Sequence, residues 1–218
     1  TGSDTGYGSI VVQNNNISQS ASFVTLRPSE ERDLGGIVVI RRGYLGSENN
    51  EDIPQGVVVR NNTIAGYIQD NPGSNSEGFG IVVEGISHQV LNNTLNNNDV
   101  GLQVQAGHLP YAANTGTDGD QNDLADQYFG RGNSPVSCDI TIGTNTFSGN
   151  GDDERFTGVV ANDLEKLVTN VNANRRFCSI NAAIASSFTA NTHVITTSAA
   201  TYPEAVVINK SVDIRGAR

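Results

Sequence analysis

A short asparagine-centred pattern recurs four times in this chain of 218 residues, and it limits the folds that the chain can adopt. Each copy reads apolar, any residue, polar, Asn, Asn or Thr, apolar. The copies lie 31 to 52 residues apart. A fixed residue inside a recurring apolar frame indicates a structure built from repeated units. The shared position is occupied by Asn15, Asn62, Asn93 and Asn145.

Glycine followed by a run of β-branched residues forms a second pattern. These runs are too short for helices and rich in Val and Ile, so they predict strands. No two-residue turn of the Asn-Gly type joins them, and no amphipathic helix precedes residue 160, which disfavours both a hairpin meander and a βαβ fold. The remaining interpretation is a solenoid of short parallel strands. The glycines are Gly36, Gly56, Gly80, Gly101 and Gly158.

The recurring asparagine has a physical role in such a solenoid. A side-chain amide carries both donors and an acceptor, so the four asparagines are expected to hydrogen-bond up and down the stack at a turn. Asparagine also tolerates the left-handed backbone that a corner requires. The flanking apolar residues then point inward. The alternative is a β-sandwich with separate Asn-rich turns, and the fixed offset of the asparagine favours the solenoid.

Most of residues 8–160 resemble the right-handed parallel β-helix of the pectate-lyase-like superfamily. The resemblance implies an all-β fold, a right-handed single-stranded parallel β-helix with three short sheets and asparagine ladders. This superfamily includes lyases, hydrolases and epimerases that act on acidic polysaccharides, so the fold alone does not decide the activity.

A second resemblance lies near the C-terminus. A short capping helix is expected near residues 179–187, with Ser179 as its N-cap and with Ile180, Ile184 and Phe188 on one face. A strand from His193 and the stretch of residues 201–217 follow. This order is similar to the way in which β-helix domains begin: a capping helix, a strand, and then a stretch with the spacing TY-x-E-x-V-x-I.

We therefore expect three parts. Residues 1–158 form the middle and C-terminal coils of a parallel β-helix with long loop insertions, and residues 159–176 form a connector. Residues 177–218 form the capping helix and first strands of a following β-helix, or of the next subunit. Open solenoid ends expose unpaired backbone groups, so we expect copies of this chain, or neighbouring β-helix modules, to stack head to tail.

Composition narrows the function classes. The chain has 13 Lys and Arg against 23 Asp and Glu, a net charge of −10, which argues against a nucleic-acid partner. No run of about 18 apolar residues is present, so no membrane span is expected. The long polar insertions are candidates for binding, including to cell-surface carbohydrate, or are merely tolerated.

The longest insertion contains a candidate calcium loop. Oxygen-bearing side chains follow the spacing of EF-hand, dockerin and thrombospondin type 3 loops, in which alternate side chains converge on a hard cation. Two departures weaken the match, because Asp123 stands where the family has Gly and Phe129 where an EF-hand has Glu. The alternative is a solvated acidic loop. The candidate Ca²⁺ ligands are Asp118, Asp120, Asn122 and Asp126.

The cysteines and histidines are less informative. Cys138 and Cys178 would form a disulfide in an exported protein, but both lie in apolar frames, and we favour two free, buried thiols. His88, His108 and His193 are isolated and are expected to be structural.

Catalysis would require convergent groups on one exposed sheet face. The nearest candidates are residues 152–155, expected in a turn after the last coil, together with Arg41, Arg42, Glu84 and Asp139. We therefore expect a non-catalytic structural module or subunit of an extracellular, bacterial surface protein or filament, resembling adhesins with tandem β-helix domains. The alternative is a carbohydrate-active lyase, hydrolase or epimerase of the β-helix class.

Overall fold

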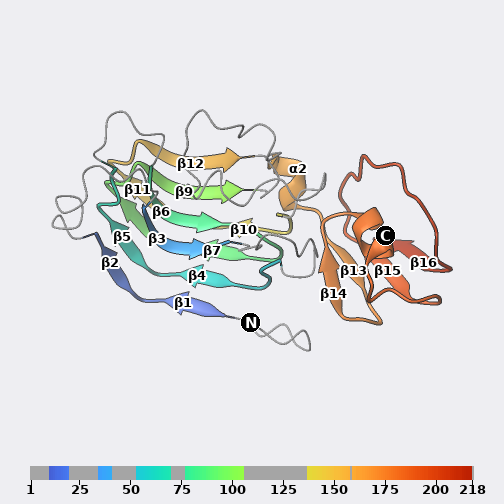
Figure 1. Cartoon of the computed structure of the whole chain (residues 1–218). Helices are drawn as coiled ribbons and strands as arrows, with labels where there is room; N and C mark the ends of the chain where they lie inside the picture. The colour runs from blue at the N-terminus through green and yellow to red at the C-terminus, as the bar shows by residue number, and fades with distance from the viewer. Residues whose placement is uncertain are drawn as a thin grey trace, which may run out of the picture.

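The computed structural model describes residues 10–19, 34–40, 53–69, 77–105, 137–157 and 159–217. Within these ranges the strands form four sheets of four strands each (Figure 1). Three of the sheets are entirely parallel, and residues 11–157 build them. The all-β class and the parallel pairing predicted from the sequence are confirmed.

The chain makes four passes through the three parallel sheets, and each pass gives one strand to each sheet. The first sheet contains β1 (Val11–Gln13), β4 (Val58–Arg60), β7 (Gln89–Leu91) and β10 (Thr141–Ile142). The second contains β2 (Asn16–Ser18), β5 (Thr63–Ala65), β8 (Thr94–Asn96) and β11 (Thr146–Ser148). The third contains β3 (Leu34–Val39), β6 (Gly78–Val83), β9 (Val100–Gln105) and β12 (Asp152–Thr157).

Apolar side chains at matching registers of successive passes form the core. In the second sheet Ile64 pairs in register with Leu95, and both side chains are fully buried. Burying one such side chain stabilises the fold by roughly 1.5–3 kcal/mol. The columns end in partly buried residues at the first pass (Val12 and Ile17) and at the last (Ile142 and Phe147). Val159 and Leu164, which follow the last pass in the chain, also pack against this core.

A column of glycines marks the entry to the third sheet. A Cβ on Gly36 would lie 2.7 Å from the carbonyl oxygen of Gly80, and a Cβ on Gly80 would lie 2.7 Å from that of Gly101. A Cβ on Gly101 would in turn meet the carbonyl oxygen of Asp153 at 2.7 Å. The last pass carries Asp153 at this position, because the described chain places no further strand beyond β12. Close approach of successive backbones therefore explains three of the five glycines in the sequence pattern.

A C-terminal unit follows the stack. It contains α2 (Ala161–Leu164), β13 (Val168–Asn170), β14 (Arg175–Phe177), α3 (Ile180–Ala185), β15 (Val194–Thr197) and β16 (Asp213–Gly216). Its sheet has the order β14-β13-β15-β16, in which only β15 and β16 are parallel. The hairpin of β13 and β14 lies in the segment expected as a connector, with one residue of β14 beyond it, and it pairs with β15.

The helix predicted near residues 179–187 is α3, and it and the residues after it make specific hydrogen bonds. Ser179 is the N-cap of α3, since its Oγ accepts from the backbone N–H of Ala182 at 3.1 Å. The carboxylate of Glu204 accepts from the N–H groups of Ile180 and Asn181 at 2.7 and 2.9 Å. The hydroxyl of Tyr202 bonds both the N–H and the carbonyl of Leu167. The Tyr and Glu of the quoted stretch therefore fasten the chain to the hairpin and to the helix.

Only the end of that stretch forms a strand. Residues 205–208 belong to no strand, and the side-chain amide of Asn181 bonds their backbone. Its Nδ2 donates to the carbonyl of Ala205 at 2.9 Å, and its Oδ1 accepts from Val207 N–H at 2.8 Å.

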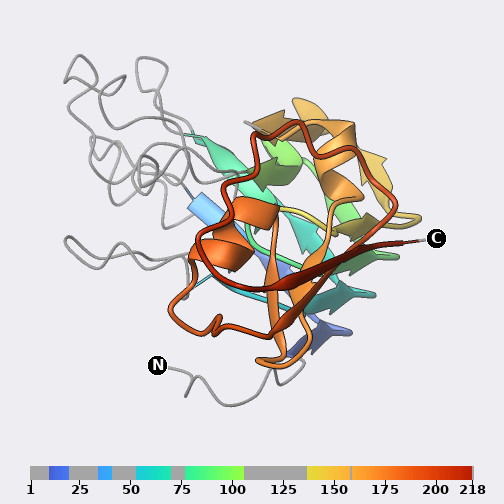
Figure 2. The ribbon, with the colours of Figure 1, turned by 90° about the vertical axis from the view of Figure 1, so that its right-hand side faces the viewer.

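The sheet of β13–β16 lies beside the stack, at the end where each pass leaves the third sheet for the first, whereas α2 packs against the stack core (Figures 1 and 2). Ile140 N–H donates to the carbonyl of Leu164 at 3.1 Å, which joins the last pass to α2. In the part of the chain that the structure describes, no helix is long and apolar enough to cross a membrane.

Candidate functional site

The predicted amide ladder is present and runs through all four passes. Nδ2 of Asn15 donates to Oδ1 of Asn62 at 2.8 Å. The next two rungs repeat this bond at 3.0 and 3.1 Å, ending at Asn145. Each Oδ1 of the three later asparagines also accepts from the backbone N–H of the asparagine before it in the ladder. The ladder therefore ties each pass to the next at a single corner.

The left-handed backbone and the ladder hydrogen bonds, both expected of one asparagine, belong to two consecutive residues. The left-handed backbone belongs to the residue before each of the first three rungs: Asn14, Asn61 and Asn92 have φ of 58°, 54° and 53°, whereas Thr144, before the fourth rung, does not have a positive φ. The rung residues themselves have ordinary φ, which places their side chains toward the stack. The double asparagine thus combines one corner residue with one ladder residue.

A second ladder lies at the next corner, and the asparagine pattern in the sequence did not predict it. Asn98 donates from Nδ2 to Oδ1 of Asn150 at 3.0 Å, and Tyr67 N–H donates to Oδ1 of Asn98 at 3.1 Å. The residue before each position again has positive φ, namely Gly66, Asn97 and Gly149. A Gly or Asn one residue before these positions was the available signal, but the tyrosine at the second pass obscured it.

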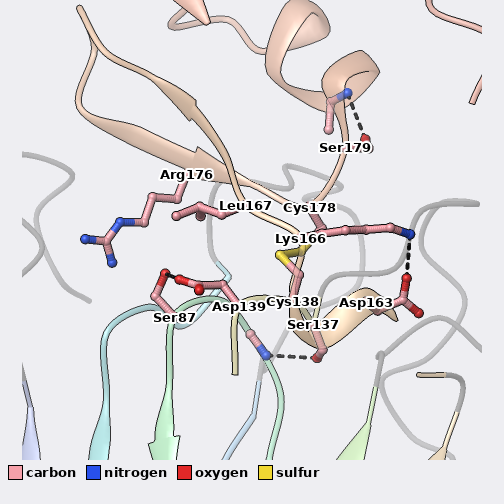
Figure 3. The surroundings of a disulfide bond; sticks show 12 residues. Ser87, Ser137, Cys138, Asp139, Asp163, Lys166, Leu167, Arg176, Cys178 and Ser179 are labelled. Carbon is pink, nitrogen blue, oxygen red and sulfur yellow. Dashed lines mark hydrogen bonds and ion pairs between the residues drawn. A yellow bond between two sulfur atoms is a disulfide. The ribbon is translucent and has the colours of Figure 1, made fainter. Parts of the chain in front are cut away.

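The cysteine prediction was wrong in its chemistry. Both residues are buried as expected, but Cys138 and Cys178 form a disulfide with Cα atoms 5.5 Å apart (Figure 3). Cys138 forms a parallel bridge with Ile86 at the corner of the stack, and Cys178 directly follows β14. The hairpin of β13 and β14, which was not predicted, brings the two sulfur atoms together.

The disulfide lies where the C-terminal unit meets the stack, among both apolar and polar side chains. Ile53, Ile86 and Leu167 pack around it. On one side Ser87 Oγ donates to Asp139 Oδ2 at 2.5 Å, and on the other Lys166 Nζ lies 2.6 Å from Asp163 Oδ1 (Figure 3). The junction is therefore a structural contact that fixes the C-terminal unit against the stack.

His88 is structural, as predicted. Val57 N–H donates to its Nδ1 at 3.1 Å, and its Nε2 lies 3.0 Å from the carbonyl oxygen of Glu84. These partners require the neutral tautomer with hydrogen on Nε2. Burial lowers the pKa of His88 to about 4, although the carbonyl of Glu84 opposes that shift. His193 bonds to Asn170, and His108 lies outside the described residues.

The acidic segment considered for catalysis is a strand and not a turn, so that expectation was wrong. Residues 152–157 form β12 by pairing with β9. Arg155 pairs with both oxygens of Glu77 and with Asp152, and these carboxylates raise the pKa of its guanidinium. The other candidates do not join it: Glu84 is fully buried, Asp139 bonds Ser87, and Arg41 and Arg42 lie outside the described residues.

The candidate calcium ligands Asp118, Asp120, Asn122 and Asp126 also lie outside the described residues, so calcium binding stays a prediction. Among the residues that are described, no three His, Cys, Asp or Glu side chains come together as a metal site.

Comparison with known proteins found no matching family model, no matching curated protein and no matching solved structure.

Proposed function

We propose that this chain is a non-catalytic structural module, or a subunit, of an extracellular surface protein or filament, built as a right-handed parallel β-helix of the pectate-lyase-like kind. The observation that carries the proposal is the amide ladder from Asn15 to Asn145. A module whose passes are joined by continuous backbone pairing and by amide ladders resists bending along the stack, which is the property that a stalk or fibre requires.

The disulfide supports an extracellular location. Disulfides persist in oxidising compartments and are rare in the cytosol. Cys138 and Cys178 are both nearly inaccessible to solvent, with 0% and 6% exposure, so the bond has a structural position. On this proposal the protein is secreted, and its insertion loops offer the surface that contacts cell-surface carbohydrate, with Ca²⁺ bound by residues 118–126.

The first pass supports end-to-end assembly. The core ends there in the partly buried Val12 and Ile17, and β1 is the edge strand of its sheet. Copies of the chain, or neighbouring modules of the same kind, would cover this edge. A contact between two different surfaces that does not close into a ring produces a filament.

Two measurements test this function. Sedimentation velocity over a wide range of concentrations should show species that lengthen as concentration rises, and a single monomeric species throughout would contradict end-to-end assembly. Incubation with pectin, alginate and glycosaminoglycans, with and without Ca²⁺, should yield neither absorbance at about 235 nm, which unsaturated products give, nor new reducing ends. Release of either product would favour the carbohydrate-active enzyme instead.

A further inference from the structure

The two ends of the stack differ sharply in charge. The described residues of the first pass, 10–19 and 34–40, contain no charged side chain. The last pass carries Asp152, Asp153 and Glu154 on its outer strand. Glu154 pairs in register with the core residue Leu102, so its carboxylate occupies an inward position. It is exposed, since the described part of the chain places no strand beyond β12. Charges at inward positions of an edge strand prevent further pairing.

The first pass has the opposite character. Ile10 and Val11 are 62% and 44% exposed. Ile10 and Asn14 bond toward β4, so the alternate residues Val11 and Gln13 direct their backbone groups to the open side of β1. Among the described residues no donor reaches Oδ1 of Asn15, whereas Oδ1 of each later rung accepts two hydrogen bonds. The open edge of β1 can therefore pair with another strand.

The C-terminal unit presents exposed apolar residues at one edge. Val207 and Ile208 are 65% and 64% exposed, and the amide of Asn181 bonds the backbone of Ala205 and Val207. The same segment continues to the ion pair of Arg215 and Asp213 on β16. Further along, β16 is an edge strand in the same sheet as its parallel neighbour β15. Within the described residues the other side of β16 pairs with no strand, so a strand of a second molecule can pair there.

We propose that the first pass of one molecule, β1 with β2, pairs with residues 206–216 of a second molecule, and that the last pass takes no part in the contact. This pairing rests on the proposed end-to-end assembly and names its two surfaces. It joins different surfaces on the two copies, so it repeats without closing.

Lysine substitutions at the two ends of one register column test the pairing. Val12, Val59, Val90 and Ile142 share an inward column of the first sheet, and Val12 and Ile142 are the partly buried residues at its ends. Val59 and Val90 have a strand on each side and are 1% and 0% exposed, so a strand added beside β1 would bury a lysine at position 12 without a partner. V12K should therefore weaken self-association at least about tenfold. The control I142K should associate like the wild type. Assembly that I142K abolishes and V12K leaves intact would overturn the pairing while preserving the proposed function, whereas absence of assembly in the wild type would overturn both.

A mixing experiment tests the polarity. V12K has a defective first pass and an intact C-terminal edge, and V207K has the reverse. At concentrations at which neither variant self-associates, their mixture should form a dimer that grows no further. Failure of the mixture to dimerise while the wild type assembles would overturn the pairing. Circular dichroism and thermal melting of each variant verify that the fold is retained.

Photo-crosslinking identifies the contact directly. A benzoylphenylalanine placed at Val207, in a mixture of ¹⁴N- and ¹⁵N-labelled protein, should give mixed-isotope crosslinks to residues 10–18. Mixed-isotope crosslinks to residues 141–157 instead would show that the C-terminal unit contacts the acidic last pass, and would overturn the proposal.

Discussion

Asn62 and Asn93, 31 residues apart in the chain, lie one above the other with Nδ2 of the first 3.0 Å from Oδ1 of the second. Asn93 also donates to the carbonyl of Val59 and to the next rung, Asn145. Asn93→Ala should therefore lower the free energy of unfolding by roughly 3 kcal/mol, because it leaves several buried groups unpaired. Urea denaturation measures the loss.

The exposed end of the same ladder provides the control. Asn15→Ala removes only a terminal rung, so we expect a loss of about 1 kcal/mol or less. Equal losses at the two positions would show that the ladder does not act through buried hydrogen bonds.

Gly80→Ala should destabilise the protein by about 2 kcal/mol or more, because its Cβ would lie 2.7 Å from a backbone oxygen in the next pass. The matched control is Gly143→Ala, whose Cβ would meet only the end of the flexible Leu91 side chain at 2.6 Å. Thermal melting of the two variants should separate them clearly. Comparable melting temperatures would contradict the close packing of backbones at the glycine column.

His88 should make stability depend on pH. In the unfolded chain its pKa is near 6.5, and in the folded protein burial lowers the pKa to about 4. Between these values the unfolded state binds the proton and the native state does not, so stability is full above about pH 6.5 and falls as the pH drops toward 4. The loss between pH 7.5 and 5 should be about 2 kcal/mol.

Denaturation of His88→Gln at the same two pH values isolates this contribution, since all other titrating groups are shared with the wild type. The variant should be less stable at neutral pH and should lose about 2 kcal/mol less on acidification. Parallel pH profiles for the two proteins would refute the assignment.

Replacing both cysteines with serine should lower the free energy of unfolding by roughly 4 kcal/mol in the chain-entropy description, since the bond closes a loop with a sequence separation of 40. Hydrogen exchange should accelerate mainly in residues 168–217, which the bond fixes to the stack. A reductant should reproduce the effect in the wild type and add nothing to the double variant. Free thiols in the denatured, unreduced protein would contradict the bond itself.

The amide ladder could be predicted because its signal is local: an asparagine at a constant place between inward apolar residues. The bond between Cys138 and Cys178 could not, because it depends on where a hairpin packs and not on spacing along the chain. The hairpin was missed because Val168, Asn170 and Phe177 belong to two strands of three residues each, too short for a clear alternating pattern.

Residues 152–155 show a different limit. Three acidic residues followed by arginine have low strand propensity, and they suggested a turn. Pairing with β9 overrides that propensity, since an edge strand can direct charged side chains into solvent.

The carboxylate of Glu154 also restricts how such a protein can lengthen. Duplicating a winding after residue 157 would cover this side chain, and an ionised group buried without a partner is destabilising by several kcal/mol. A duplication of a pass between the first and third passes would leave the acidic last pass at the end of the stack. If such a protein lengthens by gene duplication, we therefore expect the new passes in the interior of the stack and the acidic last pass at its end.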